Sequence, residues 1–219
     1  DAILAAVTAR TKIVFLTNPG NPTGTYVPYA DIKRLHAALP AHVILVLDAA
    51  YAEYVRRNDY EAGIELVSAN RNVVMTRTFS KGYGLAGLRV GCLLADPGLV
   101  AVLERVRESF NVNLPGLAAC EAALADHEHL AWVRRQNATE REALADALSA
   151  RGLAVSPSQT NFLLVDFGRD AAPVEAGLVA RGVVPRPMAG YGQPTCLRLT
   201  VGLRDENRRQ LQALDEVLT

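Results

Sequence analysis

Residues 43–51 read VILVLDAAY, an unbroken apolar run that leads into an aspartate and a tyrosine. Similar apolar runs occur on both sides of it: IVFLT at 13–17, NVVMTRT at 72–78 and RVGCLLA at 89–95. Continuous Val, Ile and Leu, in place of strict alternation with polar residues, is typical of strands covered on both faces. The segment YADIKRLHAALP at 29–40 has the spacing of an amphipathic helix. The sequence therefore predicts an α/β fold, with a mostly parallel sheet in a three-layer arrangement.

The pattern changes near residue 112. A long helical region is expected at 114–152, where Gly152 supplies the glycine that commonly follows a helix end. Beyond it, short apolar runs that include NFLLVDF and CLRLTVG alternate with two helical segments. We therefore expect two domains. Residues 1–112 form part of a larger α/β domain, and residues 113–219 form a long connecting helix and a smaller α+β domain.

The composition favours a small-molecule partner. Half of the 219 residues are apolar, and 23 basic residues balance 23 acidic residues, so the formal net charge is zero. Such a chain has no overall field that attracts nucleic acid or an anionic membrane. No apolar run approaches the roughly 18 residues that a membrane-spanning helix needs. The three cysteines and four histidines show no metal-ligand spacing, so we predict no metal site.

The first residues, DAILAAVTARTK, contain neither a methionine nor the basic and apolar regions of a signal peptide. Ile3, Leu4 and Val7 already have helical spacing, as if the chain began inside a helix. We expect from these features that a preceding part is missing from the sequence. The three widely separated cysteines, Cys92, Cys120 and Cys196, suggest no disulfide framework, so we expect a cytoplasmic protein.

Polar and glycine-rich segments follow three of the predicted strands. NPGNPTG (18–24) follows the first strand, Asp48 to Tyr51 end the second, and Thr78 to Lys81 end the third. Ligands of parallel α/β sheets bind beyond the carboxyl ends of the strands. The convergence of these segments predicts one binding site at that edge of the sheet.

Lys81 stands out because Lys12, Lys33 and Lys81 are the only lysines among 23 Lys and Arg residues. An amine can lose its proton and form a Schiff base, whereas a guanidinium cannot. Nearby Ser80 offers a hydroxyl group, and Arg89 can form a bidentate clamp on a phosphate. The residues alone leave a second interpretation open, in which Lys81 is a solvated lysine in a glycine-rich loop.

Three further residues are candidates for ligand contacts. The carboxylate of Asp48 can pair with a protonated ring nitrogen, although a helix cap or a structural ion pair explains it equally well. Tyr51 can donate a hydrogen bond into the same region or serve only in packing. Asn21, held between Gly20 and Pro22, can donate to a ligand oxygen, while a turn is the simpler interpretation of the rest of its segment.

Four motifs in this order, NPGNPTG, DAAYAEY, TRTFSKGYGLAGLRVG and CLRLTVGLRDEN, give the chain a resemblance to a known family. The chain resembles the pyridoxal-phosphate-dependent aminotransferases of fold type I (class I and II) over essentially its whole length. GVVPRPMAGYG at 182–192 makes it most similar to the histidinol-phosphate aminotransferases within them. The resemblance implies a homodimeric transaminase that binds pyridoxal 5'-phosphate, an amino acid and a 2-oxo acid.

The resemblance also implies roles around the cofactor ring. Lys81 matches the family lysine that forms the Schiff base with the cofactor and moves the proton of the substrate α-carbon. Asp48 matches the carboxylate that keeps the pyridine nitrogen protonated. Asn21 and Tyr51 match the pair that hydrogen-bonds the phenolic oxygen.

For the cofactor phosphate and the substrate, the matching residues are polar or basic. Thr78, Ser80 and Arg89 correspond to the family's phosphate-binding set. Arg198 corresponds to the arginine that binds the α-carboxylate of the substrate, and Arg186 lies where histidinol-phosphate enzymes have an arginine near the substrate phosphate. Without the resemblance, Arg198 would be interpreted as the solvent-facing residue of a strand.

Two features depart from the family pattern, and one further position matches it. Ala49 replaces the acidic residue that commonly follows the ring-binding aspartate, at a position that usually points away from the cofactor. Family members carry additional chain before the point where this sequence begins, including a loop for the cofactor phosphate and an aromatic residue that stacks on the ring. Asn161 matches a family position at the domain junction, where a structural role is expected.

We therefore expect a transaminase of histidine biosynthesis that converts L-histidinol phosphate and 2-oxoglutarate to imidazole-acetol phosphate and L-glutamate. An aromatic amino-acid aminotransferase or a threonine-phosphate decarboxylase on the same scaffold is the alternative. A catalytically silent aminotransferase-like domain or fragment is a further alternative. The joint presence of Lys81, Asp48, Arg89 and Arg198 argues against it, because folding does not require all four.

Overall fold

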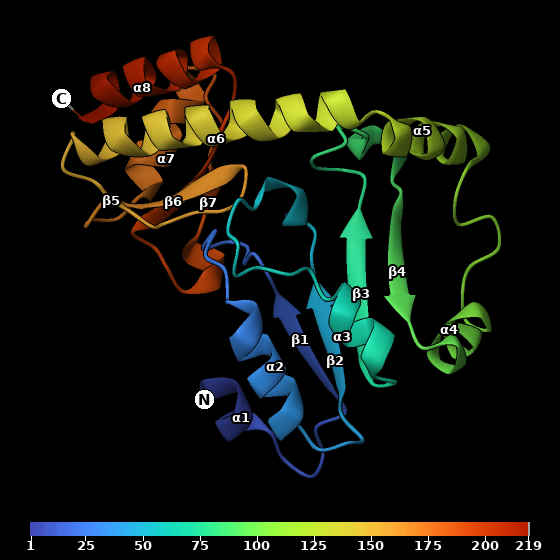
Figure 1. The fold of residues 1–219 in the computed structure, drawn as a ribbon. Helices are drawn as coiled ribbons and strands as arrows, with labels where there is room; N and C mark the ends of the chain where they lie inside the picture. Colours follow the sequence, from blue (N-terminus) through green and yellow to red (C-terminus); the bar gives the residue numbers. More distant parts are fainter. Residues whose placement is uncertain (219) are drawn as a thin grey trace. The chain divides into compact units, whose positions relative to one another are not determined.

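The computed structural model describes residues 1–218, and the chain forms two compact units (Figure 1). The first unit consists of residues 1–19 and 26–130. The second consists of residues 20–25 and the chain from Ala131 onward.

Short helices and four strands make up the first unit, which runs from blue to green in Figure 1. They are α1 (Ala2–Ala6), β1 (Ile13–Thr17), α2 (Tyr29–Ala38), β2 (Ile44–Asp48), the 3-10 turn η1 (Ala52–Tyr54), α3 (Ile64–Ala69), β3 (Val73–Thr78), the 3-10 turn η2 (Ala86–Leu88), β4 (Gly91–Ala95), α4 (Pro97–Glu104) and α5 (Leu114–Ala125).

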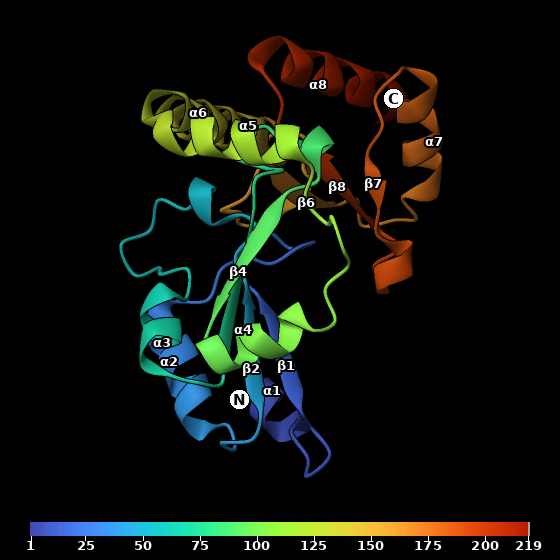
Figure 2. The ribbon, with the colours of Figure 1, turned by 90° about the vertical axis from the view of Figure 1, so that its right-hand side faces the viewer.

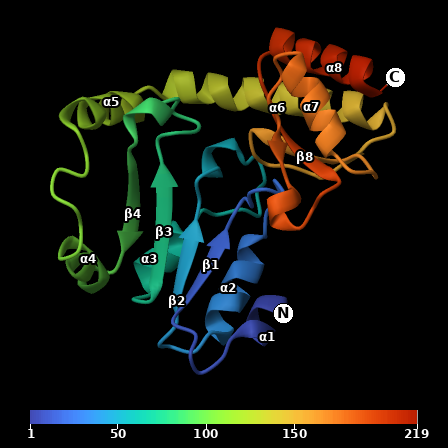
Figure 3. The same cartoon turned by 180° about the vertical axis from the view of Figure 1, so that it is seen from behind.

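The four strands form one sheet in the order β1-β2-β3-β4, which Figure 3 shows from behind. β1, β2 and β3 are parallel and β4 is antiparallel, so the prediction of a mostly parallel sheet is confirmed. The chain between β3 and β4 contains only a 3-10 turn, and a parallel return would need a crossover connection. In the register, Asp48 pairs with Thr17 on one side and with Thr76 on the other. The carboxyl ends of the parallel strands therefore lie next to one another.

The main core of the first unit lies between the sheet and helices α2 and α3. Ile32 from α2 and Leu66 from α3 pack with Leu45 and Leu47 of β2, and all four side chains are buried. The opposite face of the sheet is less covered within the described residues, where Phe15 is 71% exposed. Because successive side chains of a strand point to opposite faces, alternate residues of β2 face either this core or the open side of the sheet.

The second unit contains a long helix, a second sheet and two further helices. Its elements are most of α6 (His127–Ser149), β5 (Ala154–Val155), β6 (Phe162–Asp166), α7 (Ala172–Ala180), β7 (Arg186–Pro187), the 3-10 turn η3 (Ala189–Tyr191), β8 (Cys196–Thr200) and α8 (Arg204–Leu218). The strands form an antiparallel sheet in the order β5-β6-β8-β7.

One face of this second sheet carries the core of the unit. Leu163 and Leu199, which pair across β6 and β8, are buried with residues of α6, α7 and α8 (Figure 2). Leu164 and Arg198 form the next pair along the same two strands. Because successive side chains of a strand point to opposite faces, Arg198 lies on the face that the helices do not cover.

The long helical region expected at 114–152 consists of two helices, because the chain breaks at Asp126. The backbone of Asp126 leaves the helical conformation, and its Oδ1 accepts a hydrogen bond from the N–H of His129 at 2.9 Å. Asp126 thereby satisfies one of the free N–H groups at the start of α6. At the other end, Gly152 has a φ of 78° and follows the end of α6, as the sequence predicts.

The compact units divide at Leu130 and Ala131, beyond the boundary expected near residue 112. Cys120 of α5 is buried with Phe79 and Val90, which flank the segment between β3 and β4. This contact explains why α5 belongs to the first unit. No helix among the described residues is long and apolar enough to span a membrane.

Candidate active site

Asp48 closes β2 at the carboxyl edge of the first sheet and is half-buried. Leu47 beside it packs toward α2 and α3, so Asp48 faces the opposite side of the sheet. Its Oδ1 accepts hydrogen bonds from the N–H of Ala50 and the hydroxyl of Thr76, each at 3.2 Å. Within residues 1–218 no hydrogen bond reaches Oδ2, so this oxygen is available to a ligand donor.

Lys81 and Tyr51 come together in the first unit. Tyr51 follows β2 and is 5% exposed, whereas Lys81 is half-buried in the turn that follows β3. The Nζ atom of Lys81 lies 5.4 Å from the centre of the Tyr51 ring. A cation at this distance from an aromatic ring is stabilised by the ring quadrupole, so the contact limits where the amine can lie.

The three residues predicted to bind phosphate lie in one connected segment. Nη1 of Arg89 donates to Ser80 Oγ at 3.5 Å and to the carbonyl of Ala86 at 2.8 Å. Thr78 Oγ1 accepts the N–H of Ser80 at 3.1 Å, which ties the end of β3 to the turn. Arg89 has a φ of 57°, a conformation uncommon for residues other than glycine. The segment thus brings a hydroxyl and a guanidinium within reach of one anion.

Arg198 and Asn21 meet in the second unit. Nη1 of Arg198 donates to Asn21 Oδ1 at 2.6 Å, and its guanidinium carbon lies 4.6 Å from the centre of the Phe162 ring. The Nε atom of Arg198 is buried and has no hydrogen-bond partner among the described residues. The sequence did not predict this contact. Asn21 and Tyr51, expected to act on the same ligand oxygen, belong to different units.

Arg186 lies directly opposite Arg198, because β7 and β8 are antiparallel and the two residues pair in the register. Paired residues of adjacent strands project to the same face, a few ångströms apart. Arg186 is exposed and Arg198 is half-buried. The uncovered face of the second sheet therefore presents two guanidinium groups together.

At the two remaining positions, Asn161 and Ala49, the backbone forms hydrogen bonds. The carbonyl of Asn161 accepts the N–H of Val201 at 2.9 Å, just beyond the ends of β6 and β8. Ala49 is 1% exposed, and its N–H donates to Thr76 at 3.0 Å. Ala49 therefore places a methyl group at this buried position, where the family commonly has an acidic side chain.

A buried ion pair between Glu53 and Arg77 lies beside the predicted residues, and the sequence did not reveal it. Nη2 of Arg77 donates to Oε1 of Glu53. Burial alone would lower the pKa of Arg77, but the charge of Glu53 and the hydrogen bond to it raise this pKa. Each residue has an ordinary neighbourhood in the sequence, and only the fold brings the two together.

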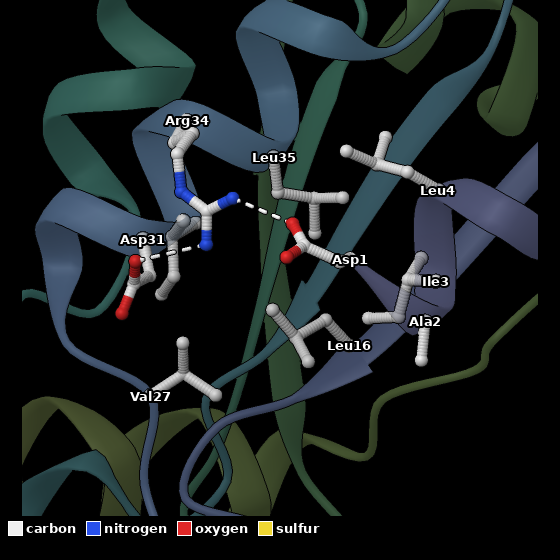
Figure 4. A pocket seen from close by; sticks show the side chains of 10 residues that line it. Asp1, Ala2, Ile3, Leu4, Leu16, Val27, Asp31, Arg34 and Leu35 are labelled. Atoms are coloured by element: carbon white, nitrogen blue, oxygen red, sulfur yellow. Dashed lines mark hydrogen bonds and ion pairs between the residues drawn. The ribbon is translucent and has the colours of Figure 1, made fainter.

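The first unit also contains a cavity of about 260 Å³, whose lining residues are drawn in Figure 4. Side chains of α1, α2 and β1 contribute to its lining, and Arg34 forms ion pairs there with Asp1 at 2.8 Å and with Asp31 at 3.2 Å. None of the predicted site residues lines it. The candidate site is therefore defined by the strand ends and not by this cavity.

Known aminotransferases are similar to this chain in sequence. Residues 1–214 match the family model described as aminotransferase class I and II. The histidinol-phosphate aminotransferase of Rhodopseudomonas palustris (strain BisB18) is 48% identical across 100% of this chain and 61% of its own length. The chain thus spans less than two thirds of that curated relative.

Solved structures share the fold. The histidinol-phosphate aminotransferase of Sinorhizobium meliloti, in complex with pyridoxal-5'-phosphate, has a TM-score of 0.82 and 35% identity, over 94% of this chain and 57% of that one. The L-threonine-O-3-phosphate decarboxylase of Porphyromonas gingivalis has a TM-score of 0.86 and 22% identity, over 99% of this chain and 67% of that one. At the lower identity the likeness concerns the fold alone.

Proposed function

The chain belongs to the family of class I and II aminotransferases, and from this premise we propose that the protein is a pyridoxal-phosphate-dependent transaminase. Its proposed substrates are L-histidinol phosphate and 2-oxoglutarate, and its products are imidazole-acetol phosphate and L-glutamate. The 48% identity to the Rhodopseudomonas palustris enzyme over the whole chain supports this substrate pair. By the same resemblance we propose a homodimer in the cytoplasm.

The residues at the ends of β2 and β3 fit pyridoxal phosphate. The free Oδ2 of Asp48 suits a protonated ring nitrogen, and Ser80 and Arg89, 3.5 Å apart, offer donors for a phosphate dianion. Lys81, which lies between Ser80 and Arg89 in the sequence, supplies the primary amine. When bound, the cofactor supplies an aldehyde that bonds to amino groups and a ring that withdraws electrons from the substrate α-carbon.

Lys81 has the role of general acid and base in this proposal. In each half-reaction its Nζ would act as base and then as acid, carrying the proton between the substrate α-carbon and C4′ of the cofactor. An arginine could do neither, because its guanidinium stays protonated. The Tyr51 ring, 5.4 Å from Nζ, restricts the positions that the amine can take.

The observation that carries the choice of substrate is the pairing of Arg186 with Arg198 across β7 and β8. Glutamate and 2-oxoglutarate carry an α-carboxylate, whereas histidinol phosphate carries a phosphate ester and no carboxylate. We propose that Arg198 binds the anionic group next to the reacting carbon in both cases. Arg186 adds a second positive charge that the phosphate dianion needs more than the carboxylate.

A threonine-phosphate decarboxylase is the second candidate, since the Porphyromonas gingivalis enzyme shares the fold and a phosphorylated substrate suits two arginines. The two candidates differ in product. A transaminase forms glutamate from 2-oxoglutarate, whereas a decarboxylase releases carbon dioxide and consumes no 2-oxo acid.

The intact protein should be purified with pyridoxal phosphate and assayed for glutamate formation with histidinol phosphate, tyrosine or phenylalanine, and for carbon dioxide release from threonine phosphate. We expect the highest kcat/KM with histidinol phosphate. Lys81→Ala should abolish both the activity and the visible absorbance of bound cofactor, while Lys12→Ala, at an exposed lysine, should preserve both. Activity in the Lys81→Ala variant equal to that of the unmodified protein would exclude the proposed role.

A further inference from the structure

The ion pair between Glu53 and Arg77 is the most deeply buried one in the first unit among the described residues. The side chain of Glu53 is 3% exposed and that of Arg77 is 23% exposed. In contrast, the Arg34–Asp1 pair has exposures of 59% and 92%. Glu53 and Arg77 are thus removed from water, unlike the residues of a surface ion pair, and we therefore ask what their hydrogen bond does within the first unit.

Glu53 and Arg77 join the two segments that carry the predicted cofactor residues. Glu53 is the middle residue of η1, two positions after Tyr51. Arg77 is the penultimate residue of β3, one position before Thr78 and four before Lys81. The hydrogen bond between them therefore links the segment after β2 to the segment after β3.

The same glutamate also lies close to the backbone at Gly82, the residue after Lys81. A Cβ atom added at Gly82 would lie 2.8 Å from Cβ and 3.1 Å from Cγ of Glu53. The backbone that follows Lys81 thus rests directly on the aliphatic part of the Glu53 side chain. Arg77, one residue before Thr78, and the approach of Glu53 to Gly82 therefore flank the segment that carries Lys81.

The titratable groups around the pair offer no competing charge. Burial, with an addition from the charge of Glu53, raises the pKa of Tyr54 to about 12. Burial is also the main cause that raises the pKa of Tyr60, of Tyr83 and of Cys92, which pairs with Arg77 in the sheet register. These groups are neutral at physiological pH. None of these neutral groups therefore offers Arg77 an alternative anionic partner.

Stability does not explain why the pair is there. Oε2 of Glu53 and Nε of Arg77 are both buried without a hydrogen-bond partner among the described residues. Unpaired buried polar atoms cost free energy, and a buried ion pair can often be replaced by apolar side chains without loss of stability. Apolar side chains cannot form a directional hydrogen bond. The hydrogen bond of this pair fixes the segment after β2 relative to the end of β3.

We propose that Glu53 and Arg77 are positioning residues for Lys81, and this inference rests on the transaminase function proposed above. Arg77 holds the start of the lysine segment through Glu53, and Glu53 supports its end at Gly82. Neither residue contacts the reacting atoms in this role. Their effect is on where the Nζ atom of Lys81 stands.

The first test replaces the pair by apolar side chains of similar length, Glu53→Met with Arg77→Met, in the intact protein. The melting temperature should stay within about 5 °C of the unmodified protein, because apolar replacement preserves packing. The kcat should fall about tenfold to a hundredfold, because small displacements of a catalytic group are costly. The KM for the amino donor should change by less than about twofold. The matched control makes the same exchanges at an exposed pair, Arg181→Met with Glu216→Met, and should leave kcat unchanged.

A second readout does not depend on turnover. The rate at which added pyridoxal phosphate becomes covalently bound to Lys81 is measured by borohydride trapping and peptide mass, and should fall with kcat in the double variant. If the unmodified protein gives no label at Lys81, the proposed function itself fails. If the folded double variant keeps the labelling rate and the kcat of the unmodified protein, only the positioning inference is overturned.

A second variant decides the question if the double variant does not fold. Gly82→Ala places a methyl group against Glu53, whereas Gly87→Ala in the same motif meets nothing within 4 Å, and neither residue has a positive φ. Gly82→Ala should slow the labelling of Lys81 about tenfold. Gly87→Ala should not slow it. Equal labelling rates in these two variants would also overturn the inference.

Discussion

At the residue scale, Arg198 and Arg186 have different roles in binding the carboxylate and phosphate groups of the proposed substrates. Arg198 is half-buried, stacked on Phe162 and hydrogen-bonded to Asn21, so its guanidinium has a fixed orientation. Arg186 is exposed on the short strand β7 and has more freedom. A planar carboxylate requires an oriented partner, whereas a phosphate dianion gains from a second nearby charge.

This division predicts different effects of two substitutions. Arg198→Ala should raise KM about tenfold to a hundredfold for both glutamate and histidinol phosphate, because it removes a charge-assisted hydrogen bond from each. Arg186→Ala should raise KM for histidinol phosphate alone. Steady-state kinetics with each donor measures both effects, and Arg169→Ala, at an exposed arginine of the same unit, is the control. An increase of the glutamate KM in Arg186→Ala would contradict the assignment.

At the element scale, ion pairs fasten α8 to the neighbouring helices of the second unit. Arg151, just after α6, donates from Nε and Nη2 to the two carboxylate oxygens of Asp215 in α8. Arg181, just after α7, donates to Glu216 at 2.8 Å. The hydrogen bond from Arg151 lowers the pKa of Asp215 below its ordinary value of 3.8. The carboxylate of Asp215 is therefore more stable in the folded than in the unfolded protein.

A lowered pKa in the folded state stabilises the fold at pH above the unfolded value and is lost as the pH falls through the folded value. Asp215→Asn should therefore lower the melting temperature at neutral pH, and the difference should shrink as the pH falls below 3.8. Thermal melting over a pH series measures this difference. Asp205→Asn, on an exposed side chain of α8, should show a smaller effect at every pH. A difference for Asp215→Asn that is constant with pH would contradict the prediction.

At the scale of the whole molecule, the residues expected to bind the cofactor lie in the first compact unit except for Asn21, and those proposed for the substrate lie in the second. Asp48, Ser80, Lys81 and Arg89 belong to the first unit, and Arg186 and Arg198 belong to the second. A ligand that binds only the folded form stabilises the elements that it contacts. Each ligand should therefore protect a different part of the chain from hydrogen exchange.

Pyridoxal phosphate alone should slow amide exchange mainly in peptides from β2 to η1 and from β3 to η2. Addition of glutamate to the loaded protein should extend the protection to β7 and β8. Hydrogen exchange followed by mass spectrometry of the intact protein measures both. Equal protection of β7 and β8 by pyridoxal phosphate alone would show that the assignment of ligands to units is wrong.

The positions of the strands and the type of the sheet were determined by the sequence itself. Apolar runs such as VILVLD and IVFLT favour strands, and glycine, proline and polar residues mark their ends, so local composition is sufficient to locate them. The chemistry of Lys81, Asp48 and the arginines is likewise a property of the residue types. These features depend on short stretches of chain and therefore need no knowledge of the fold.

Only the tertiary structure decided which side chains meet. The antiparallel direction of β4, the pairing of Arg186 with Arg198, the contact of Arg198 with Asn21 and the ion pair of Glu53 with Arg77 all join residues distant in the sequence. Each depends on strand register and on the path of loops. Those are set by hydrogen bonds and packing between segments, and a one-residue shift in register would turn each strand side chain to the other face.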